Sequence, residues 1–319
     1  MTNQISLEAV LDIAGVTLEE FVELLRKEPN YKVLSRFVER EVLTPGEPTN
    51  PGIGIVLDTE TTSKEAAEAR IIELGMVKFL FDQDTGVVYR VLARFNKLKD
   101  PGIPIPPEAT EVNNITDDMV RGQSITDEEV TDFVQEVDLV IAHNANFDRK
   151  VAEREFPIFE GKAWACTLKQ VPWQAEGIAG AKLEYIASHF GFFYEAHRAE
   201  VDCLATLECM SKRLPTSGDV VMGVLLREYR SPGFKVYALD SPFETKDLLK
   251  KRGYRWHAGE PGQEKAWGLE APSQEALEEE VKWLRQNIYR NRQFRLRVDH
   301  IDAFNRFSDR RNPQPIAFF

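Results

Sequence analysis

The sequence lacks the marks of several protein classes. Its three cysteines, Cys166, Cys203 and Cys209, contain no C-x-x-C pair, which argues against a disulfide framework and against a cysteine-rich zinc site. No stretch approaches the roughly 20 consecutive apolar residues that a membrane-spanning helix needs. The first ten residues have neither the basic start nor the apolar core of a signal peptide. We therefore expect a soluble cytoplasmic protein without a membrane partner.

Net charge is the feature of the composition that bears most on function. The 319 residues are 43% hydrophobic, as in a globular protein, and hold 40 Lys and Arg against 52 Asp and Glu, a net charge of −12. Taken alone, that charge argues against nucleic acid as a partner, because phosphate binding usually requires a basic surface. However, residues 1–220 carry 22 basic and 38 acidic side chains, whereas residues 221–319 carry 18 and 14. The acidity is therefore confined to the first part of the chain.

Residues 1–43 are predicted to form a helical arm. Thr17 and Glu20 have the spacing of a capping box, and apolar residues follow at helical intervals. The sequence favours an arm packed on the main domain, and the alternative is an arm that binds a second copy or a partner. Residues 44–52 contain three prolines and two glycines, which predicts a linker.

Residues 53–214 are predicted to form an α/β domain. Its first half contains strand-like runs, and its second half alternates a strand with helices, so a mixed sheet flanked by helices is expected. The predicted strands are 53–58, 71–81, 87–95 and 138–143, and the predicted helices are 145–155, 182–190 and 199–213. A turn at 215–219 predicts a second boundary. Residues 220–319 are then expected to form a small α+β domain, with strands at 234–240, 254–256 and 266–269 and helices at 244–252 and 273–289.

The first strand of the α/β domain runs into two acidic residues, Asp58 and Glu60. Alternate residues of a strand point to the same face, so the two carboxylates lie side by side. Like charges this close repel each other unless a proton or a cation intervenes, and carboxylate oxygens suit Mg²⁺ or Mn²⁺. The alternative is an ordinary solvated turn.

Two further motifs favour the metal site. His143-Asn-Ala-Asn-Phe-Asp148 lies where the strand 138–143 gives way to a helix, which places Asp148 near the mouth of the sheet. His197-Arg-Ala-Glu-Val-Asp202 opens the last helix of the domain. A separation of five residues cannot stack both side chains on one helical face, so we place His197 on the preceding loop and Asp202 in the first turn.

Together these motifs resemble those of the DnaQ-like exonucleases of the DEDDh type, the family that includes the proofreading subunit of bacterial polymerase III. The resemblance rests on Asp58-Thr-Glu60-Thr-Thr, Ile71-Ile-Glu-Leu-Gly75, His143-Asn-Ala-Asn-Phe-Asp148 and His197-x-Ala-x-x-Asp202, and covers about residues 53–213. It implies an RNase H-like fold, two divalent cations (Mg²⁺ or Mn²⁺), and removal of 3′-terminal nucleotides as 5′-monophosphates.

The resemblance also implies roles for individual residues. Four carboxylates would bind the metal ions and His197 would be the general base; the carboxylates are Asp58, Glu60, Asp148 and Asp202. The residues expected to contact the terminal nucleotide are Thr59, Thr61, Thr62 and Asn144. For His143 two roles are equally expected, a contact with the substrate or structural support for the end of its strand. The chain departs from the family at Val112-Asn-Asn-Ile-Thr116, which replaces a frequent Val-His-Gly-Ile-Thr and leaves the substrate preference open.

The function predicted from the sequence is a 3′-5′ exonuclease acting on single-stranded or frayed 3′ ends, with DNA preferred, in proofreading or repair. A polymerase or another replication or repair protein is the expected partner. However, Leu214-Pro-Thr-Ser-Gly218 lacks the Gln-containing clamp-binding segment usual in replicative subunits. The alternatives are an RNA-trimming exoribonuclease and a catalytically inactive nucleic-acid-binding module.

The C-terminal domain resembles a tail of unassigned function on some polymerase III epsilon-type proteins. Its basic residues are predicted to bind nucleic acid, and they are Lys246, Lys250, Lys251, Arg252 and Arg255. Aromatic residues lie among them, including Trp256 and Trp267. For these tryptophans the sequence favours a place in the core, since a small domain needs large aromatic side chains to fold.

Overall fold

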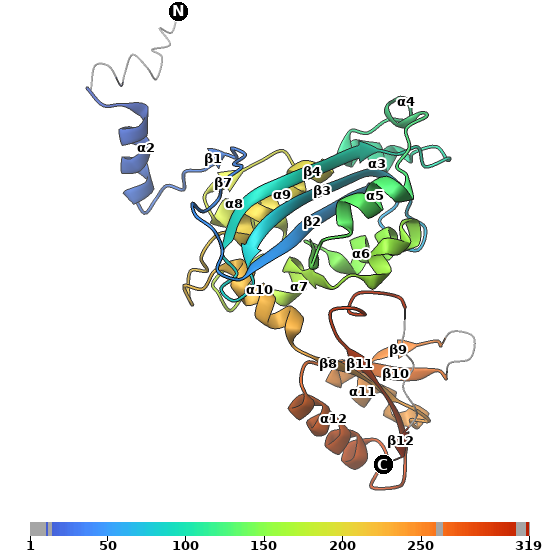
Figure 1. Cartoon of the computed structure of the whole chain (residues 1–319). Helices are drawn as coiled ribbons and strands as arrows, with labels where there is room; N and C mark the ends of the chain where they lie inside the picture. Colours follow the sequence, from blue (N-terminus) through green and yellow to red (C-terminus); the bar gives the residue numbers. More distant parts are fainter. Residues whose placement is uncertain (1–10, 12–14, 260–263, 311–316, 319) are drawn as a thin grey trace, which may run out of the picture.

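The computed structural model describes residues 11, 15–259, 264–310 and 317–318. Most of the first 14 residues of the predicted arm, and part of the C-terminal end, lie outside the described residues. Two five-stranded sheets organise the described chain, one in the α/β domain and one in the C-terminal domain (Figure 1). The predicted mixed α/β fold is confirmed.

The larger sheet has the strand order β4-β3-β2-β5-β6. Its strands are β2 (Pro51–Thr61), β3 (Ile71–Asp82), β4 (Val88–Leu98), β5 (Leu139–Ala142) and β6 (Trp164–Cys166). The pairs β2–β3 and β3–β4 are antiparallel hairpin-type pairs, while β2, β5 and β6 run parallel. The sheet is therefore mixed, with β2 as the strand at which the two patterns meet.

Helices cover both faces of this sheet, which explains why β3 is an almost continuous buried run rather than an alternating one. On one face lie α8 (Leu183–His189), α9 (Ala199–Met210) and α10 (Val221–Arg230), and on the other lie α5 (Asp127–Val134) and α6 (Ala145–Glu155). Alternation along β2 divides the two cores, because Val56 packs against the first group and Ile55 and Leu57 against the second. Short helices complete the domain: α3 (Pro107–Asn113), α4 (Asp117–Val120), η1 (Pro157–Gly161) and α7 (Thr167–Gln170).

The structure moves the predicted boundary between the two domains. The buried residues of α10, from Val221 to Leu226, belong to the same core cluster as α8 and α9. The turn 215–219 is closed by a hydrogen bond from the Leu214 amide to the Asp219 carbonyl (2.8 Å), so it lies inside the α/β domain. The boundary predicted at residue 220 is therefore one helix too early, and the smaller domain begins at β8 (Gly233–Ala238).

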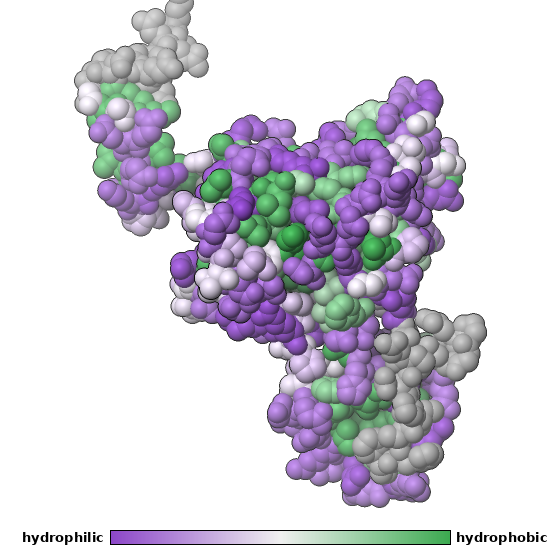
Figure 2. All heavy atoms as spheres, viewed as in Figure 1, coloured by the Kyte–Doolittle hydropathy of each residue, from purple (hydrophilic) through white to green (hydrophobic). Residues whose placement is uncertain are grey.

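The N-terminal arm is helical over a shorter range than predicted. The helix α2 (Leu18–Lys27) begins with the predicted capping box, but residues 35–36 form the strand β1 (Ser35–Arg36), which pairs with β7 (Phe192–Phe193). Packing of the helix on the main domain, which the sequence favoured, is not observed: no residue of α2 is buried. Figures 1 and 2 show α2 standing away from the main body, with hydrophobic and hydrophilic side chains on its surface.

The C-terminal domain is a sheet of order β12-β11-β8-β10-β9, with every pair antiparallel. Its elements after β8 are η2 (Phe243–Thr245), α11 (Lys246–Arg252), β9 (Arg255–His257), β10 (Ala266–Ala271), α12 (Gln274–Asn287), β11 (Arg295–Ile301) and β12 (Ala317–Phe318). The predicted α+β elements up to α12 are present, whereas β11 and β12 were not predicted. Leu249, Tyr254 and Leu284 lie in the core between the helices and the sheet.

Residues 302–310, here called the C-terminal strap, return from β11 to the α/β domain (Figure 1, dark red). The fully buried Arg149 of α6 donates to the carbonyls of Ala303 (3.0 Å), Phe304 (2.6 Å) and Arg306 (2.7 Å). The Trp164 amide of β6 also donates to the Ala303 carbonyl (2.8 Å), beside the edge of the sheet. The strap therefore ties the smaller domain to the helix that carries Asp148.

Among the described residues, no helix is both long and apolar enough to cross a membrane.

Candidate active site

The predicted carboxylates meet at the end of β2. Strand β2 pairs with β5 only from Gly54 to Val56, so one edge of β2 is open beside Asp58 and Glu60. The other edge continues to pair with β3, where Asp58 lies opposite Gly75 and Glu60 lies opposite Glu73. Asp58 and Glu60 therefore extend a rigid strand into a region that other elements can approach.

Helix α9 reaches these carboxylates because it packs directly on β3. A Cβ atom at Gly75 would lie 2.4 Å from the backbone carbon of Ala199, so only glycine permits this approach. Ala199 is fully buried at the start of α9, where a larger side chain would push the helix away. As a result Asp58, Glu60 and Asp202 place carboxylate oxygens within 4.8 Å of one another. The packing explains why Gly75 and Ala199 belong to the motifs.

The fourth carboxylate, Asp148, comes from α6 at the open edge of β2. The hydroxyl of Thr59 donates to Asp148 Oδ1 over 2.9 Å, and both side chains are buried. Thr59 points to the opposite face from Asp58 and Glu60, so Asp148 approaches around the strand from the other side. The structure thus brings together all four carboxylates that the sequence predicted, with three of them in the tightest group.

The cluster is electrostatically unfavourable without a cation. Burial raises the pKa of Asp58 well above its usual value, and the charges of Asp148 and Asp202 raise it further. Burial and then Asp202 raise the pKa of Glu60 to about 8, and burial raises the pKa of Asp148 to about 7 despite its hydrogen bonds from Thr59. A bound divalent cation would offset this repulsion, and carboxylate oxygens are the ligands that such a cation prefers.

His197 lies where the sequence predicted, on the loop before α9, and its side chain is exposed. Its backbone is left-handed (φ 70°), which is uncommon for a residue other than glycine. The amides of His197 (2.8 Å) and Arg198 (3.1 Å) both donate to Asp202 Oδ2, and the Tyr194 hydroxyl donates to Oδ1 (2.9 Å). Asp202 therefore fixes the loop that presents the imidazole.

Glu73 and Arg198 form an ion pair that the sequence analysis did not assign. The Glu73 carboxylate is 1% exposed and accepts from Arg198 Nη2 (2.8 Å), from Arg198 Nε (3.1 Å) and from the Ala199 amide (3.1 Å). The pair anchors the first turn of α9 on β3, next to the His197 loop. A charged residue in the apolar run 71–81 was the signal that could have revealed Glu73. For Tyr194, which contacts Asp202, the sequence carries no such signal.

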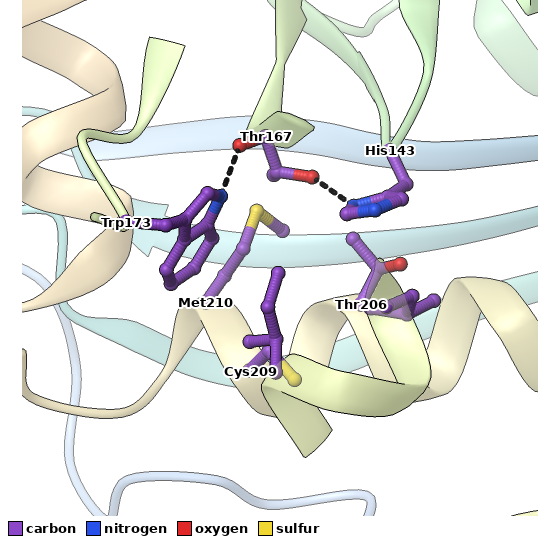
Figure 3. Close-up of a pocket in the computed structure, with 8 residues that line it drawn as sticks. His143, Thr167, Trp173, Thr206, Cys209 and Met210 are labelled. Atoms are coloured by element: carbon purple, nitrogen blue, oxygen red, sulfur yellow. Dashed lines mark hydrogen bonds between the residues drawn. The ribbon is translucent and has the colours of Figure 1, made fainter. Parts of the chain in front are cut away.

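His143 supports the end of its strand. Its Nδ1 atom hydrogen bonds with the Thr167 hydroxyl (2.8 Å; Figure 3), and its Nε2 atom hydrogen bonds with the Ala181 carbonyl (2.9 Å). Burial lowers the pKa of His143 to about 4, so the ring is neutral at pH 7. Figure 3 shows it on the wall of a small pocket with Trp173 and Met210, which encloses no space for a water molecule. Of the two roles considered, the structural one fits these contacts.

The other predicted nucleotide contacts surround the carboxylates. Thr62 is buried and its hydroxyl accepts from the Arg70 amide (3.1 Å), while the Thr61 hydroxyl donates to the Ser63 carbonyl (2.8 Å). Asn144 is exposed at the N-cap of α6, where its side chain makes no capping hydrogen bond. A substrate contact by any of the three stays a prediction.

The departure from the family at residues 113–114 has a structural explanation. Asn113 is buried, and its side chain hydrogen bonds with Glu60 and accepts from the Ile115 amide (2.9 Å). Asn114 takes the left-handed conformation (φ 58°) in which asparagine is the usual replacement for glycine. The loop therefore contacts the site through the Asn113 carboxamide, which hydrogen bonds with the Glu60 carboxylate.

Comparison with known proteins agrees with this geometry. The family model described as "Exonuclease" matches residues 55–210. The DNA polymerase III subunit epsilon of Treponema pallidum (strain Nichols) is 34% identical over 160 residues, which are 47% of this chain and 71% of that protein. The chain belongs to the DnaQ-like exonuclease family. The predicted 3′-5′ exonuclease is thereby confirmed at the level of the family.

Other known proteins are also similar to this chain. The epsilon subunit of Aquifex aeolicus (strain VF5) is 28% identical, over 51% of this chain and 81% of its own length. The PolC-type DNA polymerase III of Clostridium perfringens (strain 13 / Type A) is 32% identical, over 49% of this chain but only 11% of its own. A solved structure of exonuclease X with 5′-overhanging duplex DNA is 25% identical, with a TM-score of 0.41 over 54% of this chain and 97% of that one.

Proposed function

We propose that this exonuclease removes nucleotides from single-stranded or frayed 3′ ends of DNA and releases 5′-mononucleotides. The observation that carries the proposal is the convergence of Asp58, Glu60 and Asp202 within 4.8 Å, with Asp148 at the open edge of the same strand. DNA is the preferred substrate in this proposal, because the relatives reported above are subunits of DNA polymerase III.

The four carboxylates fit the divalent cations that the family implies. They offer only oxygen ligands, Asp148 is buried while the other three are half-buried, and their pKa values are raised where no cation compensates their charge. Asp58, Glu60, Asp148 and Asp202 would hold two ions, Mg²⁺ or Mn²⁺. When bound, the ions would offset the negative charge of the phosphodiester and polarise it.

His197 is proposed as the general base. A neutral imidazole can accept the proton of a water molecule at neutral pH, so that the water oxygen bonds to phosphorus while the bond from phosphorus to the 3′ oxygen breaks. The exposed ring is free to face the substrate, while the bonds from the His197 and Arg198 amides to Asp202 hold its backbone. Asn144, Thr59, Thr61 and Thr62 are proposed to position the terminal nucleotide.

The partner proposed for the enzyme is a polymerase or another protein of replication or repair. Sequence similarity to epsilon subunits supports it. A pull-down with the tagged full-length protein, followed by mass spectrometry, tests this part. Recovery of RNA-processing proteins in place of replication or repair proteins would count against it.

The experiment that tests the activity uses labelled single-stranded DNA, mismatched duplex DNA and RNA of equal length. We expect stepwise shortening from the 3′ end with Mg²⁺ or Mn²⁺, fastest on single-stranded DNA, and no shortening in EDTA. Undiminished activity in EDTA would refute the metal assignment. Faster shortening of RNA would replace the DNA proposal with the exoribonuclease that the sequence left as an alternative.

A further inference from the structure

One surface of the C-terminal domain combines exposed aromatic rings with lysines. Phe243 lies just before α11, and Lys246 and Lys250 follow at three and seven residues, on the same face of the helix. The Lys246 Nζ atom lies 4.2 Å from the centroid of the Phe243 ring, and the Lys250 Nζ atom lies 5.9 Å from the centroid of Trp267. Trp267 is paired across the strands with Trp256, at 5.5 Å between ring centroids. These five residues form a continuous row, here called the aromatic-basic stripe.

The exposure of the stripe corrects the sequence analysis. The prediction that the tryptophans belong to the core is correct for Trp267, which packs against the core cluster, but wrong for Trp256, which is 52% exposed. Phe243 is 78% exposed. Two large rings at this exposure contribute little to folding, because the stabilisation from an aromatic side chain depends on the apolar area that it buries.

Other cations lie near the stripe. Lys251 is exposed in the last turn of α11, whereas Arg255 is exposed at the start of β9 and points to the opposite face of the sheet from Trp256. Arg252, which the sequence grouped with them, is paired with Glu280 (2.6 Å) and stacks on Trp283 (5.1 Å), so its charge is already compensated. The acidic residues Glu244 and Asp247 are also exposed near the start of α11. The three lysines, Lys246, Lys250 and Lys251, against these two anions leave this surface positive.

We propose that the aromatic-basic stripe binds single-stranded DNA by stacking bases on Phe243 and Trp256 while the lysines contact phosphates. Proteins that bind single strands without sequence preference use this combination of aromatic rings and a basic track. The two exposed rings lie at the ends of the row and the lysines lie between them. This proposal rests on the proposed function, which supplies DNA as the substrate.

The C-terminal strap gives the stripe a fixed relation to the active site. The strap is held by three hydrogen bonds from Arg149, the residue that follows the carboxylate Asp148. An ion pair of Arg310 with Glu153 of α6 (2.8 Å) adds to this attachment. A DNA strand bound on the C-terminal domain would therefore stay close to the carboxylates of the exonuclease domain.

Truncation cannot test the proposal, because α10 and the strap are packed into the exonuclease domain. The test instead measures binding of fluorescent oligothymidylate to the full-length protein in EDTA, by fluorescence anisotropy. Without cations hydrolysis stops and no metal ion holds a phosphate at the carboxylates, so the signal reports binding elsewhere.

We expect Trp256→Ala and Phe243→Ala each to weaken binding about tenfold, since each removes a ring on which one base stacks. Trp256→Phe, which keeps a ring, restores most of the affinity. The matched control is Phe193→Ala in the exonuclease domain, which removes a ring that is 42% exposed and carries Arg36 at 5.3 Å. Circular dichroism and thermal unfolding check that each variant is folded.

The outcomes separate this proposal from the proposed function. Loss of binding in the two stripe variants, with unchanged binding in Phe193→Ala, supports the stripe even if the wild-type protein shows no hydrolysis. Binding unchanged by Trp256→Ala and Phe243→Ala overturns it even if hydrolysis proceeds. Tighter, Trp256-dependent binding of an oligouridylate RNA would overturn the choice of DNA.

Discussion

The exonuclease domain gathers four carboxylates around the end of β2, whereas the C-terminal domain places aromatic rings and lysines along one surface. The first arrangement cannot meet a phosphodiester without added cations, because burial and mutual repulsion already raise the pKa values of its carboxyl groups. The second needs no cofactor, since its charges are exposed and positive. The net charge of the whole chain is therefore a poor guide to its partner, because the acidic and the basic residues are concentrated in different domains.

The two regions also differ in how their residues are held. Asp202 accepts three hydrogen bonds and Asp148 accepts one from Thr59, so these two carboxylates of the proposed metal site are held in place by the protein itself. By contrast, much of the surface of Phe243 and Trp256 is exposed to solvent. An exposed ring can stack on any of the four bases, because every base has a flat aromatic face. The four predictions that follow test this division, from the largest expected effect to the smallest.

The largest effect is expected from Asp58→Asn. The change keeps the size of the side chain but removes a charged oxygen from the cluster, so hydrolysis should fall to background. Calorimetric titration with Mn²⁺ should show lost or weakened metal binding. The control is Asp118→Asn, which alters an exposed carboxylate paired with Arg121 (2.6 Å). Cleavage at the wild-type rate by Asp58→Asn would contradict the site.

Replacement of the proposed base should slow the reaction without emptying the metal site. We expect His197→Ala to lower kcat by about 10²-fold or more, as is typical for loss of a general base. Metal affinity, measured by the same titration, should stay close to that of the wild type. His300→Ala, an exposed histidine of the C-terminal domain, serves as the control. A kcat unchanged in His197→Ala would assign the proton transfer to another group.

A smaller effect is expected from Glu73→Gln, which acts through Arg198. The change weakens charge-assisted hydrogen bonds worth roughly 1.5–3 kcal/mol each and loosens the first turn of α9. We expect kcat to fall about tenfold with little change in KM, because the His197 loop is less well oriented while the substrate contacts remain.

The matched control for Glu73→Gln is Glu47→Gln, which removes an exposed ion pair with Arg90 (2.7 Å) on the same sheet. Such a pair contributes at most about 1 kcal/mol. Equal effects of the two substitutions on kcat would show that Glu73 has no positioning role. Arg198→Lys, which keeps the charge but loses the paired geometry, should fall between the wild type and Glu73→Gln.

The smallest effect concerns the salt dependence of DNA binding. Each lysine that contacts a phosphate of a single strand contributes about 0.7 to the slope of log affinity against log salt. Lys250→Ala combined with Lys251→Ala should therefore lower the slope by about 1.4. The control pair, Lys27→Ala with Lys32→Ala on the arm, should leave the slope unchanged. An unchanged slope in the first pair would place the phosphates elsewhere.

The sequence located the candidate site residues better than the limits of the domains. Asp58, Glu60, Asp148, His197 and Asp202 lie at the ends of elements whose hydrophobic patterns are clear, so their positions could be read locally. The boundary at residue 220 failed because a turn inside a domain and a turn between domains have the same composition. Only the packing of α10 against α8 and α9 distinguishes them.

By itself, the sequence determined the mixed α/β fold, the exonuclease family and the set of carboxylates, because these depend on local periodicity and on motifs at strand and helix ends. Tertiary structure alone decided that Glu73 pairs with Arg198, that Tyr194 holds Asp202, and that the strap rests on Arg149. It also decided that Trp256 is exposed while Trp267 is covered. The physical reason is that these contacts join residues distant in sequence, so burial and partner depend on how whole elements pack and not on the neighbours along the chain.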